Sequence, residues 1–381
     1  MTTERPILWT PSTERANGTS LAQYIEWLRE NRGLTFADYP AMWEWSVSDL
    51  SGFWSSVIEF FDIRLTAPYS EVISDRAMPG TVWFKGATLN FADQMLRFAK
   101  TQPEQLAIIL QSETFGRSTL TWRELAAQVA SVAARFKAMG VTKGDRVVAI
   151  LPNTEPALIA CLATVSLGAI WSLCSPNMGH VAILDRFRQI EPKILIAQDG
   201  YVHAGKMIDR SEAIETISQG LPSVTHQIRV PVVGDAPSDA ILWDDLLGEK
   251  ADLDTTQVEF DHPLWIVYSS GTTGNPKPIV SGHGGVLLEG AKQSLHMDLS
   301  TKDRYSWMTS SGWIMWNSQF TALGQGSTVA MFDGAVNHPD LLELWRFVAR
   351  EKLTFFGAGA AFYMTCMKAG LRPADLLDLN A

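Results

Sequence analysis

This 381-residue sequence contains few cysteines, and it has fewer basic than acidic residues. The three cysteines, Cys161, Cys174 and Cys366, lack the spacing of metal ligands and are too few for a disulfide framework. The 31 Lys and Arg residues are outnumbered by 41 Asp and Glu residues, which gives a net charge of −10. This balance argues against broad binding to nucleic acid or to an anionic membrane. We therefore expect a reduced, cytoplasmic setting, with no nucleic-acid partner and no membrane association.

Several common catalytic patterns are also missing. There is no G-x-S-x-G, which disfavours hydrolase triad chemistry, and no G-x-G-x-x-G follows a predicted strand. The histidines show no paired spacing for a metal ion. We expect His262, His283, His296 and His338 to lie at the surface or at the ends of elements. The sequence therefore predicts no metal site built from its own side chains.

One apolar stretch, at residues 157–175, approaches the length of a membrane span. Thr164, Ser166 and Gly168 interrupt it, and Pro156 lies where the first turn of a helix would begin. These interruptions favour a buried helix followed by a buried strand at residues 169–173 over a membrane helix. Residues 1–11 have no apolar core behind a basic start, so we expect no signal peptide.

The chain divides into two regions of different character. Residues 1–100 are rich in tryptophan, show helical spacing at residues 21–32 and 50–61, and lack clear strands. From about residue 104, apolar strands alternate with amphipathic helices, as in βαβ units. We therefore predict an α/β fold in which a helical N-terminal cap (residues 1–100) precedes a mostly parallel, doubly wound sheet (residues 101–381).

The most informative stretch is residues 268–277, Y-S-S-G-T-T-G-N-P-K, which follows a short apolar strand at 264–268. Glycines let the backbone approach an anion, successive N–H groups form a concave nest, and hydroxyls add donors. The composition predicts a phosphate-binding loop, although a polar hairpin turn is the alternative and the spacing is not that of the nucleotide loop G-x-x-x-x-G-K-[ST]. The residues concerned are Ser269, Ser270, Gly271, Thr272, Thr273, Gly274 and Lys277.

This stretch resembles the signature loop of the adenylate-forming enzymes, which include acyl-CoA synthetases, luciferases and the adenylation domains of peptide synthetases. The resemblance implies the fold of their large domain. It also implies that the loop holds the β- and γ-phosphates of ATP while a carboxylate attacks the α-phosphate, with Lys277 and Thr272 as its catalytic residues.

A second stretch, G-W-I-M-W-N at residues 312–317, resembles the acyl-pocket segment of the acetyl-CoA synthetase branch, in the form typical of acetoacetyl-CoA synthetases. The resemblance implies that Trp313 and Ile314 line the carboxylate substrate and that Met315 lies near the thioester-forming end. An aromatic helix entrance is the alternative. In the same branch the turn at residues 174–179 and the segment at 204–206 contact CoA, with Lys206 at a CoA phosphate; a solvated surface lysine is the alternative there.

The resemblance covers essentially the whole chain and implies an ATP-dependent acid–thiol ligase that forms acetoacetyl-CoA through an acyl-adenylate, with ATP, Mg²⁺ and CoA. A ligase for acetate or propionate and a non-catalytic ATP- or CoA-binding remnant are the alternatives. We do not find the family's adenine loop, its ribose-binding Asp or its C-terminal lid with the catalytic lysine. We therefore expect this chain to be a truncated form that needs a C-terminal half as partner to complete the reaction.

Overall fold

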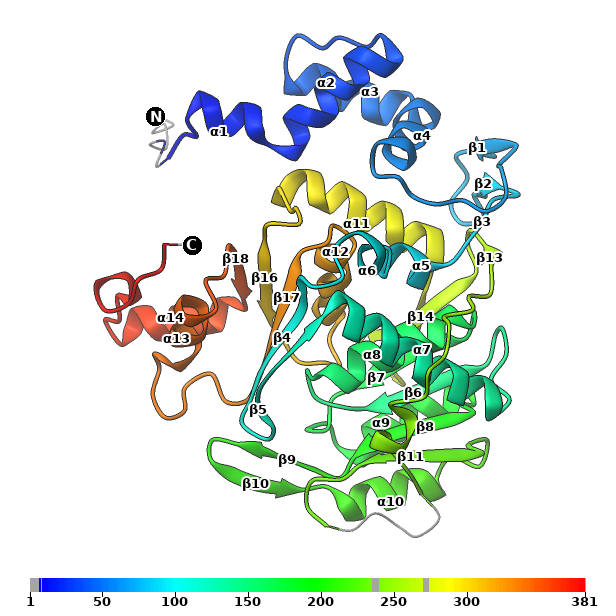
Figure 1. The fold of residues 1–381 in the computed structure, drawn as a ribbon, viewed down its shortest axis with the longest axis vertical. Helices are drawn as coiled ribbons and strands as arrows, with labels where there is room; N and C mark the ends of the chain where they lie inside the picture. The colour runs from blue at the N-terminus through cyan, green and yellow to red at the C-terminus, as the bar shows by residue number, and fades with distance from the viewer. Residues whose placement is uncertain (1–6, 8, 235–239, 270–273, 381) are drawn as a thin grey trace.

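The computed structural model describes residue 7 and residues 9–234, 240–269 and 274–380. These residues form a helical N-terminal region and two mainly parallel sheets with helices against them (Figure 1). The predicted α/β class with mostly parallel strands is confirmed.

The N-terminal region consists of short helices whose first turns are capped by polar side chains. They are α1 (Thr13–Gly18), α2 (Ser20–Arg32), α3 (Tyr39–Ser48) and α4 (Leu50–Phe60). Their N-cap side chains, Ser12, Thr19, Asp38 and Asp49, each accept a hydrogen bond from a backbone N–H of the first turn. Tyr24 of α2 is fully buried and shares a 2.6 Å hydrogen bond with Ser56 of α4. Both helices contact α11 (His283–Met297), so this region covers α11 from above in Figure 1.

The expectation that residues 1–100 lack strands is wrong. β1 (Glu71–Ile73) pairs with β2 (Trp83–Lys85), and β3 (Thr88–Leu89) pairs with β13 (Val258–Glu259). Strands of two or three residues are too short to show an alternating pattern. Two of the tryptophans in this region, Trp9 and Trp43, are more than half exposed. The region ends in α5 (Phe91–Met95) and α6 (Phe98–Thr101).

The larger sheet has seven strands in the order β12-β11-β8-β6-β7-β14-β15. Neighbours run parallel except for β14 and β15, which form an antiparallel hairpin at one edge. The strands are β6 (Arg146–Ile150), β7 (Ile170–Cys174), β8 (Ile194–Gln198), β11 (His226–Val230), β12 (Ile241–Leu242), β14 (Pro263–Ser269) and β15 (Lys277–Gly282).

A second sheet of five strands has the order β18-β16-β17-β4-β5, also parallel apart from the β4–β5 hairpin. Its strands are β4 (Leu106–Ser112), β5 (Gly116–Thr121), β16 (Arg304–Met308), β17 (Thr328–Asp333) and β18 (Phe355–Ala358). The sequence did not predict this division into two sheets, because β4 pairs with a strand that follows more than 200 residues later. It also missed β5, whose polar residues resemble a turn before a helix.

Helices α7 (Trp122–Ala138) and α8 (Glu155–Ser166) pack on each other between the sheets, with α7 against β4 and β5 and α8 against β7. Thr121 and Glu124 form a capping box at the start of α7. The apolar stretch at residues 157–175 forms the buried α8 followed by β7, as predicted. No helix within the described ranges is long and apolar enough to cross a membrane.

The remaining elements lie around these sheets. They are α9 (His180–Phe187), η1 (Arg188–Ile190), β9 (Gly200–His203), β10 (Lys206–Asp209), α10 (Ser211–Gln219), η2 (Trp243–Leu246), η3 (Ile314–Ser318), α12 (Gln319–Leu323), α13 (Glu343–Arg350), α14 (Ala360–Lys368) and η4 (Pro373–Asp375).

Candidate functional site

The predicted phosphate loop connects the two strands of the edge hairpin. Ser269, the last residue of β14, pairs in register with Lys277, the first residue of β15. The pairing brings both ends of the loop side by side. Gly274 and Lys277 are exposed to solvent. The predictions for Ser270, Gly271, Thr272 and Thr273 lie outside the described residues.

Helix α9 and the turn after it hold the base of this hairpin. The Tyr268 hydroxyl donates to the Arg186 carbonyl at 2.8 Å, and Gln189 Nε2 donates to the Pro276 carbonyl at 3.0 Å. Burial raises the pKa of Tyr268, so the phenol stays protonated and remains a donor at neutral pH. Both ends of the loop are therefore held by the continuous segment α9–η1.

The G-W-I-M-W-N segment is anchored by its second tryptophan. Trp316 is fully buried, and its Nε1 donates to Asn153 Oδ1 at 3.0 Å. Gln319 Nε2 donates to the same oxygen at 3.2 Å. The backbone before this anchor passes very close to the turn at residues 174–179, because a Cβ on Gly312 would lie 2.9 Å from the Ser175 nitrogen. The structure thus brings together the second and third stretches that the sequence singled out.

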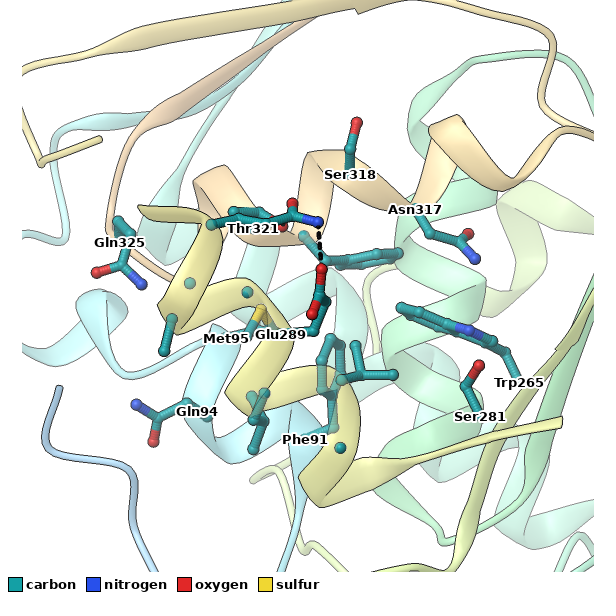
Figure 2. A pocket seen from close by; sticks show the side chains of 18 of the residues that line it. Phe91, Gln94, Met95, Trp265, Ser281, Glu289, Asn317, Ser318, Thr321 and Gln325 are labelled. Atoms are coloured by element: carbon teal, nitrogen blue, oxygen red, sulfur yellow. Dashed lines mark hydrogen bonds between the residues drawn. The ribbon is translucent and has the colours of Figure 1, made fainter. Parts of the chain in front are cut away.

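A cavity of about 530 Å³ lies beside this segment, between η3, α12, α11, α5 and β14 (Figure 2). This volume is in the range of small-molecule sites. Ile314 and Met315 line it. Trp313 does not; it is 59% exposed and lines a second, much smaller cavity behind Asn317. Gly285 of α11 also lines the large cavity and has open space where a Cβ would stand.

The large cavity contains one carboxylate, Glu289 of α11. Its Oε1 accepts from Gln293 Nε2 at 2.8 Å, and its Oε2 lies 2.7 Å from Lys292 Nζ. Burial by itself would raise the pKa of Glu289, but the bonds from Lys292 and Gln293 outweigh it and hold the pKa below its usual range. The charge of Glu289 is therefore already paired within α11.

The sequence analysis did not identify α11 or Trp265 as part of the wall of the large cavity. Trp265 lies in the middle of β14 and lines both cavities together with Asn317. A signal for α11 was available, since Gly285, Glu289 and Gln293 recur every four residues and share one helical face. No comparable signal marks Trp265, because a tryptophan in an apolar strand reads as ordinary core.

Lys206, predicted at a CoA phosphate, lies exposed at the start of β10. Its hairpin is held by Glu113, whose carboxylate accepts from the backbone N–H groups of Ala204, Gly205 and Ala335. In Figure 1 this hairpin lies at the lower edge of the molecule, whereas α11 and α12 lie nearer its middle. The structure therefore does not bring Lys206 together with the residues of the large cavity.

His283 lies at the end of an element, as expected, but not at the surface. His283 is fully buried at the start of α11, and its Nδ1 accepts from the Phe91 N–H at 3.2 Å. Helix α5 packs against this end of α11. In the part of the chain that the structure describes, no group of three or more His, Cys, Asp or Glu side chains could hold a metal ion.

Comparison with known proteins assigns the family. The family model described as "AMP-binding enzyme" matches residues 95–380. The chain belongs to this family. The family model of the acetyl-coenzyme A synthetase N-terminus matches residues 39–95 of the same chain.

Members of the AMP-binding family that resemble this chain include several named acetoacetyl-CoA synthetase. The protein of that name from Rhizobium meliloti is 37% identical over 390 residues, covering 100% of this chain and 59% of its own length. That from Gallus gallus is 34% identical, covering 99% of this chain and 58% of its own. The solved structure of acetoacetyl-CoA synthetase from Streptomyces lividans superposes with a TM-score of 0.96 at 43% identity, covering 98% of this chain and 58% of that one. This chain thus spans less than three-fifths of the length of these relatives.

Proposed function

We propose that the protein is an ATP-dependent acid–thiol ligase that forms acetoacetyl-CoA from acetoacetate. The observation that carries the proposal is the position of the 312–317 segment, which lines a substrate-sized cavity beside the strand that leads into the signature loop. The names of the relatives, which match over essentially the whole chain, support acetoacetate as the acid.

The proposed reaction has two steps. A carboxylate oxygen attacks the α-phosphorus of ATP and pyrophosphate leaves; the CoA sulfur then attacks the acyl carbonyl and AMP leaves. In the first step the loop hydroxyls and backbone N–H groups, with the Lys277 ammonium, stabilise the charge that develops on pyrophosphate. The proposed loop contacts are Ser269, Ser270, Gly271, Thr272, Thr273, Gly274 and Lys277, with Thr272 and Lys277 as the catalytic pair.

Mg²⁺ enters this proposal as part of the ATP substrate. Magnesium is usually held by one or two carboxylates together with substrate phosphates and water, so it needs no cage of protein ligands. The described residues, which contain no cluster of three ligating side chains, fit this mode.

At the proposed binding site of the carboxylic acid, Ile314 and Met315 line the large cavity, and Trp313 lines the smaller cavity beside it. Lys206 would contact a phosphate of CoA at the exposed hairpin. We also propose the division into a cap (residues 1–100) and an adenylation core (residues 101–381), which is supported by the two family models that match residues 39–95 and 95–380.

The test is acid-dependent release of pyrophosphate from ATP and Mg²⁺, with acetoacetate, acetate or no acid. Release that requires acetoacetate supports the proposal. Lys277→Ala should then lower the rate on the order of 10²-fold, because one charge-stabilising donor is lost. Lys302→Ala removes another exposed lysine, in the turn before β16, and should leave the rate unchanged.

Two other outcomes identify the alternatives. Equal or greater release with acetate would favour an acetate-type ligase, for which the match to the acetyl-coenzyme A synthetase N-terminus is the supporting observation. Binding of ATP or CoA without release of pyrophosphate from any acid would favour a non-catalytic nucleotide-binding role.

A further inference from the structure

Two hydrogen-bond donors in the wall of the large cavity have no acceptor. Trp265 is 4% exposed and its Nε1 is fully buried, as is Asn317 Nδ2; neither nitrogen has a hydrogen-bond partner among the described residues. Buried donors are almost always paired in folded proteins, so an unpaired one marks the place of a water or a ligand. Two such donors in one wall mark a place for an acceptor atom.

Both residues line the same small space. Trp265 and Asn317 line the large cavity and also a neighbouring cavity of about 10 Å³, enclosed by β7, β14 and the 311–313 turn. This volume holds about one water molecule or one carbonyl oxygen. Figure 2 shows the two nitrogens on the same side of the large cavity. Trp171 of β7, the register partner of Trp265, also lines the small cavity, and its Nε1 has no hydrogen-bond partner within the described ranges.

The two donors are held rigidly in position. The Trp265 ring lies between Phe91 and Phe320, with ring centroids 5.7 Å away in both cases. Asn317 follows the anchored Trp316, and the next residue, Ser318, accepts a 2.8 Å hydrogen bond from the Tyr305 hydroxyl. A site whose donors are fixed before the ligand arrives loses little entropy on binding.

The hydrogen-bonding groups in the cavity wall determine which kind of ligand group can bind there. The donors require an acceptor, and an uncharged carbonyl oxygen can accept two hydrogen bonds through its two lone pairs. The nearby carboxylate of Glu289 is already paired with Lys292 and Gln293, so it supplies no acceptor for these donors. Its negative charge also disfavours a ligand with a second carboxylate at this end.

We propose that Trp265 Nε1 and Asn317 Nδ2 form the subsite that recognises the 3-oxo oxygen of a short 3-oxo acid. The inference rests on the proposed function, which supplies a substrate with this group. The oxygen occupies the small cavity between β7 and β14 and accepts a hydrogen bond from each nitrogen. The subsite thereby distinguishes a 3-oxo acid from a saturated acid of the same length.

The experiment compares acetoacetate with butanoate, which has the same number of carbon atoms and lacks the 3-oxo oxygen. Calorimetry measures the affinity of the protein for each acid, and pyrophosphate release gives the selectivity in turnover. Asn317→Leu removes one donor at similar size, and Trp265→Phe removes the other while keeping an aromatic ring. Each variant should lower the preference for acetoacetate about tenfold, the effect of one hydrogen bond, mostly by weakening acetoacetate binding.

Gln325→Leu is the matched control, because it also changes an amide to an aliphatic side chain on the cavity wall, but at the opposite end in Figure 2. It should keep the wild-type preference. If Trp265→Phe does not fold, the Asn317→Leu and Asn317→Asp variants decide the test, the second because it replaces the donor with an acceptor of the same shape.

Each outcome separates this subsite from the overall function. Equal binding of both acids by the wild type, no binding of either, or a preference that survives in both variants overturns the subsite even if acetoacetate supports pyrophosphate release. A binding preference that the variants lose supports the subsite even if no acid supports pyrophosphate release, a result that would reject only the proposed function.

Discussion

Mild acid should destabilise the protein through one buried histidine, His283. Its ring is fully buried, Nδ1 accepts from the Phe91 N–H, and Nε2 has no hydrogen-bond partner in the described ranges. Burial, followed by the positive charges of His262 and Lys143, lowers the pKa of His283 to about 3. In the folded protein the ring therefore stays neutral at pH values where it would be protonated in the unfolded chain.

The sign and size of the effect follow from this difference. Between about pH 6.5 and pH 3 the unfolded chain binds a proton that the folded protein excludes, so stability falls as the pH is lowered through this window. From the two pKa values, lowering the pH from about 7.5 to about 5.5 should cost about 1.4 kcal/mol of unfolding free energy through His283.

The assay is urea denaturation at both pH values for the wild type, His283→Asn and His296→Asn. Asparagine places its Oδ1 where Nδ1 accepts from Phe91 and does not titrate, so His283→Asn should lose about 1.4 kcal/mol less than the wild type on acidification. His296 is exposed near the end of α11, and its replacement should leave the pH dependence unchanged. If His283→Asn loses as much stability between the two pH values as the wild type, the argument from the buried neutral ring is wrong.

Two further predictions concern buried polar groups. Burial, with the nearby charge of Glu113, raises the pKa of Asp333 to about 6 although Ser112 donates to it, so the wild type should lose stability as the pH rises from about 4 to about 7. Over this pH range the unfolding free energy of the wild type should fall by on the order of 3 kcal/mol through Asp333, and Asp333→Asn should not show this fall in urea denaturation. If the variant has the same pH dependence as the wild type, the raised pKa of Asp333 is contradicted. Asn90 Nδ2 donates to three backbone carbonyls at 2.8–3.1 Å, so Asn90→Ala should lower the unfolding free energy by about 2–4 kcal/mol, whereas the exposed Asn31→Ala should change it by less than about 1 kcal/mol.

Local elements could be predicted because their signals lie within a few residues of one another. The capping box at Thr121 and Glu124, the helix–strand pair at residues 155–174 and the apolar strand before the signature loop all depend on neighbours in sequence, and the structure contains all three. The polar strand β5 and the two-residue β3 were missed, because neither has enough alternating residues to show a pattern.

The sequence by itself determined the α/β class and marked two segments, the predicted phosphate loop at residues 268–277 and the aromatic segment at 312–317, since composition and short spacing carry these signals. Only the tertiary structure decided which residues share a wall. Trp265 from a strand, Glu289 from α11 and Asn317 from η3 meet at one cavity, and Lys206 lies away from it. The pairing of β4 with β17, like the burial of His283 under α5, depends on contacts between segments about 200 residues apart. Such contacts are set by the packing of whole elements, and no local pattern of residues encodes them.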